Sequence, residues 1–228
     1  TSMYKVSPSL IGMLLECPRC LWLHYREKIE RPRGIFPSLP SGMDQVFKNY
    51  FDIYRSKNEL PPELVGKITD AKLYSEDMDR FNVWRNINFG RGGFKAEFTE
   101  YNMLLQGAVD EILVNQKGEF VPFDFKTRGY PTKEDTHEHY QHQLDLYALL
   151  FENNGFKSAS IGYLLFFWPQ EYEEGIVRFN SELKKIDVSP ERGREVLEET
   201  HKIISGSKPE AHENCEFCRW VDDVHEIL

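Results

Sequence analysis

Glu119-Phe-Val-Pro-Phe-Asp-Phe-Lys-Thr127 is an apolar run that contains one carboxylate and one ammonium group near its end. Its length and aromatic content predict a buried β-strand. Successive side chains of a strand point to opposite faces. Asp124 and Lys126 therefore project to the same side, while Phe123 and Phe125 point into the body of the protein.

A second carboxylate lies on the run that precedes this strand. Residues 104–114 read as another strand and contain Asp110, and Asn115-Gln-Lys-Gly118 reads as the hairpin turn between the two runs. The turn would bring Asp110 within a few ångströms of Asp124. Mg²⁺ and Mn²⁺ prefer such oxygen ligands, and Lys126 would orient a metal-bound water. On spacing alone, these groups are equally well explained as exposed hairpin ends.

A polar stripe occurs on the helix predicted over residues 137–152. His139, Gln143 and Tyr147 recur every four residues and so share one face of that helix. A polar stripe on an otherwise apolar helix needs a polar partner or water. A metal site holding a phosphate group would supply that partner, whereas for His139 a solvent-facing position stays open.

The remaining patterns predict a single α/β domain over residues 1–228, with a mixed central sheet flanked by helices. Residues 58–92 are polar and broken, which favours a long loop or an inserted lobe. Further helices are expected at 7–17, 43–55 and 189–205, and further strands at 94–98, 160–168 and 175–180.

The composition is that of an ordinary globular chain of 228 residues with a net charge of −9. This charge argues against a general nucleic-acid coat but allows local phosphate contacts. No apolar run approaches the roughly 18 residues of a membrane span, and the first residues lack the layout of a signal peptide. We therefore expect a cytoplasmic protein that does not associate with a membrane.

The four cysteines fall into two C-x-x-C pairs, Cys17-Pro-Arg-Cys20 and Cys215-Glu-Phe-Cys218. Each pair can chelate an ion, and four thiolates complete a tetrahedral zinc site or hold an iron–sulfur cluster. Four unrelated buried cysteines would rarely fall into two such pairs. A shared centre would join the two ends of the chain and close a long loop.

Three motifs in order resemble the PD-(D/E)XK nuclease superfamily, and more narrowly its RecB-like branch: Gly107-Ala-Val-Asp110, Asp124-Phe-Lys126 and Gln143-Leu-Asp-Leu-Tyr147. The resemblance implies a restriction-endonuclease-like core and a Mg²⁺- or Mn²⁺-dependent deoxyribonuclease, exonucleolytic or preferring single strands. DNA, single- or double-stranded, would be its substrate. The implied metal ligands are Asp110, Asp124 and the carbonyl of Phe125, with Lys126 catalytic and Gln143 and Tyr147 supporting the site.

The chain departs from this pattern upstream. RecB-like nucleases usually carry Gly-x-x-x-His, whose histidine is a further metal ligand, whereas this chain reads Gly42-Met-Asp-Gln-Val46. Asp44 is a candidate substitute ligand, or else a carboxylate favoured by the helix dipole. The missing histidine leaves a second hypothesis open, a weakly active or inactive nucleic-acid-binding module on the same fold.

The cysteines also depart from the relatives that the resemblance suggests. CRISPR-associated and AddB-type RecB-like nucleases carry one cysteine before the core and three after it, holding a [4Fe-4S] cluster. This chain has two before and two after. A [4Fe-4S] cluster at Cys17, Cys20, Cys215 and Cys218 is the expectation, and Zn²⁺ is the alternative.

Overall fold

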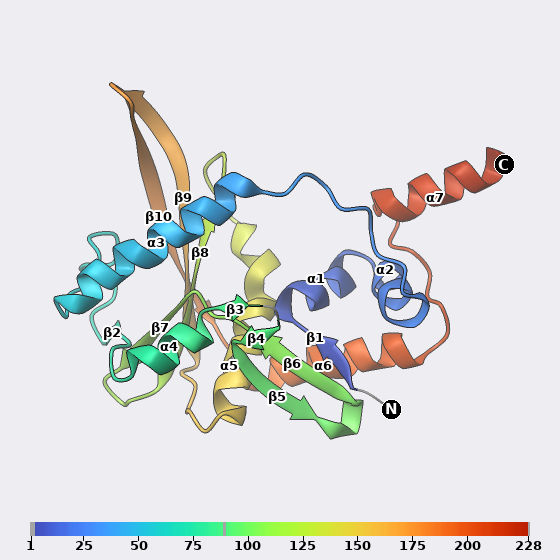
Figure 1. The fold of residues 1–228 in the computed structure, drawn as a ribbon, viewed down its shortest axis with the longest axis horizontal. Coiled ribbons are helices and arrows are strands. Elements are labelled where there is room, and N and C mark those ends of the chain that lie inside the picture. Colours follow the sequence, from blue (N-terminus) through green and yellow to red (C-terminus); the bar gives the residue numbers. More distant parts are fainter. Residues whose placement is uncertain (1–2, 89, 228) are drawn as a thin grey trace.

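A computed structural model describes residues 3–88 and 90–227 and shows a mixed α/β fold (Figure 1). The helices are α1 (Pro8–Glu16), α2 (Pro18–Trp22), a π-helical turn η1 (Leu23–Glu27), α3 (Ser38–Ser56), α4 (Met78–Trp84), η2 (Thr99–Tyr101), η3 (Thr136–Tyr140), α5 (Gln141–Asn153), α6 (Pro190–Ser205) and α7 (Glu216–Ile227). The strands are β1 (Tyr4–Val6), β2 (Ala71–Leu73), β3 (Ile87–Asn88), β4 (Arg91–Gly92), β5 (Phe94–Phe98), β6 (Met103–Gly107), β7 (Glu111–Asn115), β8 (Phe120–Thr127), β9 (Ile161–Glu173) and β10 (Ile176–Asp187).

The larger sheet has five strands in the order β10-β9-β8-β7-β2. Its central strand β8 runs antiparallel to β7 and parallel to β9. Helix α3 lies across one face, where Phe47 and Phe51 pack on Phe125 (Figure 1). Helix α5 covers the other face of β8, where Gln143 contacts Asp124. The predicted alternation along β8 is confirmed, because Phe123 and Phe125 lie on the face toward α3 and Asp124 lies on the face toward α5.

The predicted strand over 104–114 is wrong as a single element. It is two strands, β6 and β7, which belong to different sheets: β6 pairs with β1 and β5, and β7 pairs with β8 and β2. The chain crosses between the sheets at residues 108–110. Gly107 marks the crossing, since a Cβ there would lie 3.0 Å from Leu150 and 3.3 Å from Pro8. The chain is therefore closely packed against two other segments at the end of β6.

The expectation of a loop or lobe over 58–92 is also partly wrong. Strand β2 lies in this region and forms the edge of the larger sheet next to β7. Helix α4 follows, and Asp77 caps its first turn by accepting the backbone N–H of Arg80. A three-residue strand has too few side chains to show a period, so the pairing partner determines its conformation.

Several local predictions are confirmed. Ser7 and Ser189 cap α1 and α6, and Gly118 closes the hairpin turn at a φ of 77°. Strands β9 and β10 are longer than predicted, and their hairpin projects away from the body (Figure 1). Helix α7 was not predicted; it lies with α2 at the opposite end of the molecule from that hairpin.

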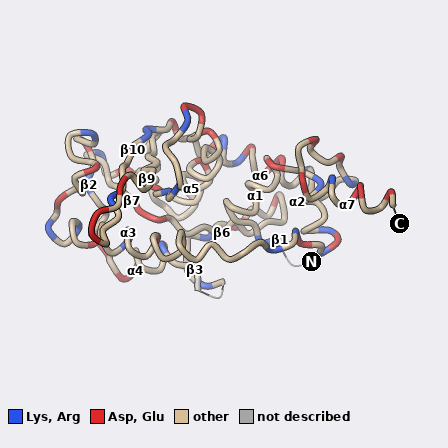
Figure 2. The backbone as a smooth tube through the Cα atoms, turned by 90° about the horizontal axis from the view of Figure 1, so that it is seen from above, with Lys and Arg blue, Asp and Glu red and all other residues tan. Residues whose placement is uncertain are grey.

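Charged residues of both signs are interspersed along the whole backbone (Figure 2). Among the described residues, no helix combines the length and the apolar character needed to cross a membrane.

Candidate active site and metal centre

Asp124 and Lys126 meet at the end of β8, as their spacing predicts. The Asp124 side chain is only 1% exposed, and its Oδ2 lies 2.5 Å from the Lys126 ammonium. The ammonium also lies 4.8 Å from the centre of the Tyr140 ring. Tyr140 was not singled out from the sequence, because a cation–π contact leaves no spacing pattern.

Gln143 connects the helix to this pair. Its Oε1 accepts a hydrogen bond from Lys126 at 3.0 Å, and its Nε2 donates to Asp124 Oδ1 at 3.0 Å and to the Tyr147 hydroxyl at 2.7 Å. The Tyr147 hydroxyl in turn donates to the carbonyl of Ala108 at 2.8 Å. The predicted stripe therefore holds for Gln143 and Tyr147. It is wrong for His139, which is exposed in η3 before α5 begins.

Asp110 lies in the crossing segment just before β7, where its Oδ2 accepts the backbone N–H of Phe125 at 3.3 Å. Burial raises the pKa of Asp110 well above its usual range, and repulsion from Asp124 raises it further. Burial alone would lower the pKa of Lys126, but the attraction of Asp124 and Asp110 outweighs it and raises that pKa. Lys126 is therefore protonated at neutral pH.

Asp44 projects from α3 toward the same place and is paired there with Lys48, whose ammonium lies 2.8 Å from Asp44 Oδ2. The Lys48 ammonium also lies 3.8 Å from Asp110 Oδ1. The sequence interpretation missed Lys48. A signal for it does exist in the sequence, because a charged residue stands between Phe47 and Phe51 on the apolar face of α3 and follows an acid at i+4.

Asp44 and Asp110 border a cavity of about 300 Å³ that is also lined by Pro40, Phe47, Phe125, Lys126 and Thr127. Buried Asp124 Oδ2 accepts no hydrogen bond of good geometry from the described residues, so only its charge contact with Lys126 compensates it. Hard carboxylate oxygens with unused acceptor capacity suit Mg²⁺ or Mn²⁺. The carboxylates of Asp110 and Asp124 have oxygens of this kind.

The four cysteines form a second cluster. All four are buried, and their sulfur atoms lie within 4.8 Å of one another. Among the described residues, this is the one group of three or more metal-binding side chains that lie so close together. The predicted joining of the two chain ends is thus confirmed. Burial would raise the pKa of Cys215, but hydrogen bonds from the backbone of Cys218 and from neighbouring thiols lower it to about 7. At least one thiol is therefore ready to bind metal near neutral pH.

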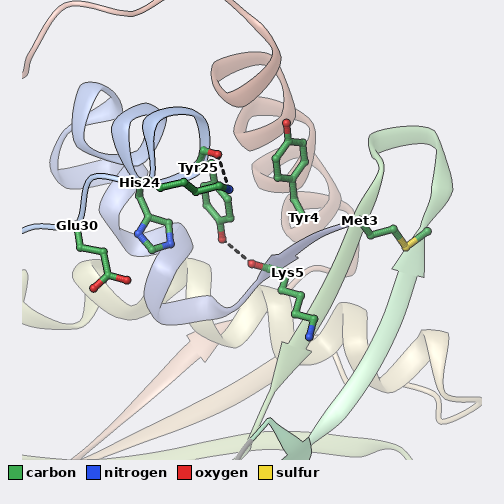
Figure 3. A pocket seen from close by; sticks show the side chains of 7 residues that line it. Met3, Tyr4, Lys5, His24, Tyr25 and Glu30 are labelled. Carbon is green, nitrogen blue, oxygen red and sulfur yellow. Dashed lines mark hydrogen bonds between the residues drawn. The ribbon is translucent and has the colours of Figure 1, made fainter. Parts of the chain in front are cut away.

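A separate cavity of about 320 Å³ lies between β1 and η1 (Figure 3). The Tyr25 hydroxyl donates to the carbonyl of Lys5 at 2.7 Å, and the Lys28 ammonium donates to the carbonyl of Tyr25 at 2.9 Å. The first of these bonds joins β1 to η1, whereas the second lies at the end of η1 itself. The residues around this cavity therefore connect β1 to η1 and are not part of the acidic site.

Comparison with known proteins identifies a family. The sequence model of the PD-(D/E)XK nuclease superfamily matches residues 57–222. No curated protein matches the chain significantly. A solved structure titled "Crystal structure of SSO0001" is similar at 17% identity, covers 96% of this chain and 84% of its own, and has a TM-score of 0.43. Because the matching segment makes up more than half of the chain and contains Asp110, Asp124 and Lys126, the protein belongs to the PD-(D/E)XK nuclease superfamily.

Proposed function

We propose that this protein is a RecB-like, divalent-metal-dependent nuclease that hydrolyses phosphodiester bonds in DNA. One observation carries the proposal: Gln143 connects Lys126, Asp124 and Tyr147 in a single polar network beside Asp110. Residues from β8, from the segment before β7 and from α5 thereby converge next to a cavity. If these residues were only the exposed end of a hairpin, nothing would require them to contact one another.

Each residue has a distinct role in this proposal. Asp110, Asp124 and the Phe125 carbonyl would hold Mg²⁺ or Mn²⁺, which supplies a water of lowered pKa and neutralises phosphate charge. Lys126 carries a positive charge, since the carboxylates raise its pKa. It therefore orients the attacking water and stabilises the negative charge that develops, rather than accepting a proton at the start. Gln143 and Tyr147 fix the orientation of Asp124 and Lys126.

The direct test is cleavage of labelled DNA with Mn²⁺. We expect Lys126→Ala and Asp124→Asn to lower the rate by about 100-fold or more, the usual loss when a charge-stabilising group is removed. Lys72→Ala, on exposed β2, removes a positive charge outside the acidic site and serves as control. Equal cleavage by the wild type and Lys126→Ala would disprove the assignment.

We further propose exonucleolytic attack on single strands, on the RecB-like resemblance alone. Linear and circular DNA, each single- and double-stranded, separate the possibilities. Rapid loss of linear single strands with survival of circles supports the proposal. Cleavage of circular substrates would instead make the protein an endonuclease.

A binding module without activity is the second candidate, and one contact favours it: Asp44, the candidate substitute for the usual histidine, is already paired with Lys48. Calorimetric titration distinguishes the two candidates. Mn²⁺ binding that disappears in Asp110→Asn supports the nuclease. A protein that binds DNA but no Mn²⁺ at this site supports the module.

For the four thiols we propose a single Zn²⁺ in place of the [4Fe-4S] cluster that the resemblance suggests. A tetrahedral ion with zinc–sulfur bonds of about 2.3 Å places its ligands about 3.8 Å apart. Three of the six sulfur separations are 3.6 Å for Cys20–Cys215, 3.7 Å for Cys20–Cys218 and 3.8 Å for Cys17–Cys218, and all six are within 4.8 Å. A four-iron cluster would hold the sulfurs further apart. Protein purified without oxygen should be colourless and contain one zinc; absorption at about 400 nm would identify a cluster instead.

Free thiols of this kind suit a reducing compartment, and we propose the cytoplasm as the place where the protein acts.

A further inference from the structure

Lys48 is a second lysine of the acidic site, and the motifs do not account for it. It lies on the inner face of α3 and is only 9% exposed. Its ammonium lies 2.8 Å from Asp44 Oδ2, 3.8 Å from Asp110 Oδ1 and 3.4 Å from the carbonyl of Arg85. A nearly buried ammonium thus stands between two carboxylates that would otherwise be available to a metal.

The two lysines divide the acids between them. Lys126 neutralises Asp124, and Lys48 neutralises the side formed by Asp44 and Asp110. Two ammonium groups offset two of the three acids, so at most one net negative charge is left, which a single divalent ion already exceeds. A second divalent ion on the Asp44 side would lie within a few ångströms of the Lys48 charge, where repulsion in a partly buried site is strong.

We propose that Lys48 is a built-in counter-ion that takes the place of a second divalent ion and competes with the first for Asp110. The proposal rests on the proposed nuclease function and deepens it: the site takes one ion, held between Asp110 and Asp124. Lys48 does not line the cavity. It is a positioning residue, which acts through Asp44 and Asp110 rather than on the substrate.

The test is titration of the purified protein with Mn²⁺, followed by calorimetry and by electron paramagnetic resonance. The wild type should bind one Mn²⁺ that is lost in Asp110→Asn. Lys48→Met should bind the ion at least tenfold more tightly, because the competing charge is gone. Lys48→Gln, which keeps a hydrogen-bond donor for Asp44, should show the same tightening if the methionine variant folds poorly.

Two further variants connect the effect to its cause. Lys48→Arg keeps the charge and should bind Mn²⁺ as the wild type does. Asp44→Asn combined with Lys48→Met should keep most of the gained affinity, because the ion is held by Asp110 and Asp124 and the competition that is relieved is for Asp110. Lys72→Met, on exposed β2, is the control for removal of a charge outside the site and should change nothing.

The outcomes separate the two proposals. A merely structural lysine would leave Mn²⁺ affinity unchanged or weaken it on substitution. One Asp110-dependent ion with no tightening in Lys48→Met and Lys48→Gln, or two ions in the wild type, overturns the role of Lys48 and leaves the nuclease proposal standing. A wild type with no Asp110-dependent Mn²⁺ overturns both.

Discussion

Gln143 uses both ends of its amide, accepting from Lys126 while donating to Asp124 and Tyr147. A glutamate could not do this, since a carboxylate has no donor and would repel Asp124. A leucine would fill the space but leave Asp124 without its only side-chain hydrogen-bond donor among the described residues. The amide is therefore the group that keeps the acid and the lysine in a fixed relation.

We accordingly predict that Gln143→Leu lowers DNA cleavage by about 10- to 100-fold, the usual effect of removing a group that orients a metal ligand. The measurement is the initial rate at saturating Mn²⁺. Gln116→Leu, in the exposed hairpin turn, is the matched control. A Gln143 variant as fast as the control would show that the hydrogen bonds are dispensable.

A buried ion pair lies near the site without belonging to it. The Arg55 guanidinium lies 2.5 Å from Glu111 Oε2, and both side chains are less than 5% exposed. Burial raises the pKa of Glu111, and the attraction of Arg55 only partly offsets this. In the folded protein Glu111 therefore holds a proton to higher pH than it does in the unfolded chain.

Arg55→Met should cost about 3–5 kcal/mol at neutral pH, because it leaves Glu111 buried without a counter-charge. The pKa of Glu111 then rises further in the folded variant. The variant is therefore most stable at acid pH and loses stability as pH rises through that pKa. Urea unfolding at several pH values measures the loss. Lys67→Met, an exposed substitution, should show no such dependence. A loss independent of pH would contradict the assignment to Glu111.

Helices α5 and α6 pack closely against each other at Gly193. A Cβ at this position would lie 2.7 Å from the carbonyl oxygen of Asp145 and 3.2 Å from the Cβ of Leu149. At Gly42, inside α3, a Cβ would meet no other atom within 4 Å. Gly193 therefore permits close packing of two helices, whereas Gly42 only weakens the helix that contains it.

We predict that Gly193→Ala destabilises the protein by about 1–3 kcal/mol through overpacking. Gly42→Ala should stabilise it by about 0.5–1 kcal/mol by favouring the helix. Thermal unfolding of both variants measures the two signs. Destabilisation by both would mean that α3 needs the flexibility of Gly42.

Elements set by neighbouring residues were predictable from the sequence. The caps Ser7 and Ser189 and the turn ending at Gly118 depend on local hydrogen bonds and backbone angles. The break between β6 and β7 was not predictable, because it depends on which sheet each strand pairs with and β6 pairs with the distant β1. The candidate site divides in the same way: motif spacing indicated Asp124 and Lys126, whereas no motif led to Lys48.

At the scale of the whole molecule, we propose that residues 1–228 form one domain. Strand β8 serves two hydrophobic clusters, with Phe120 in the cluster toward α5 and Val121 and Phe123 in the cluster toward α3. Neither cluster can lose its packing without exposing the shared strand. Circular dichroism and tryptophan fluorescence should therefore report one coincident unfolding transition in urea; two separate transitions would indicate two domains.

The thiol cluster joins α7 and the segment before it to α2. Arg19 supports this connection by donating to the carbonyl of Pro209 and by pairing with the carboxylates of Glu210 and Asp222. Cys215→Ser should lower the midpoint of thermal unfolding and speed proteolysis between α6 and α7, because the ligand set is broken. Ser207→Ala, in the same connection, is the control. Unchanged proteolysis would show that α7 is held by its other contacts.

The position of the cysteines also orders events during synthesis. Cys17 and Cys20 leave the ribosome almost two hundred residues before Cys215. The acidic site is complete once β8 and α5 have been made, but the metal centre must wait for α7. Cys17 and Cys20 therefore stay an open chelating pair while the intervening residues are made, and a chain cut short before Cys215 can never close the cluster. Closure of the thiol cluster distinguishes a chain that has passed Cys218 from one that stopped before Cys215.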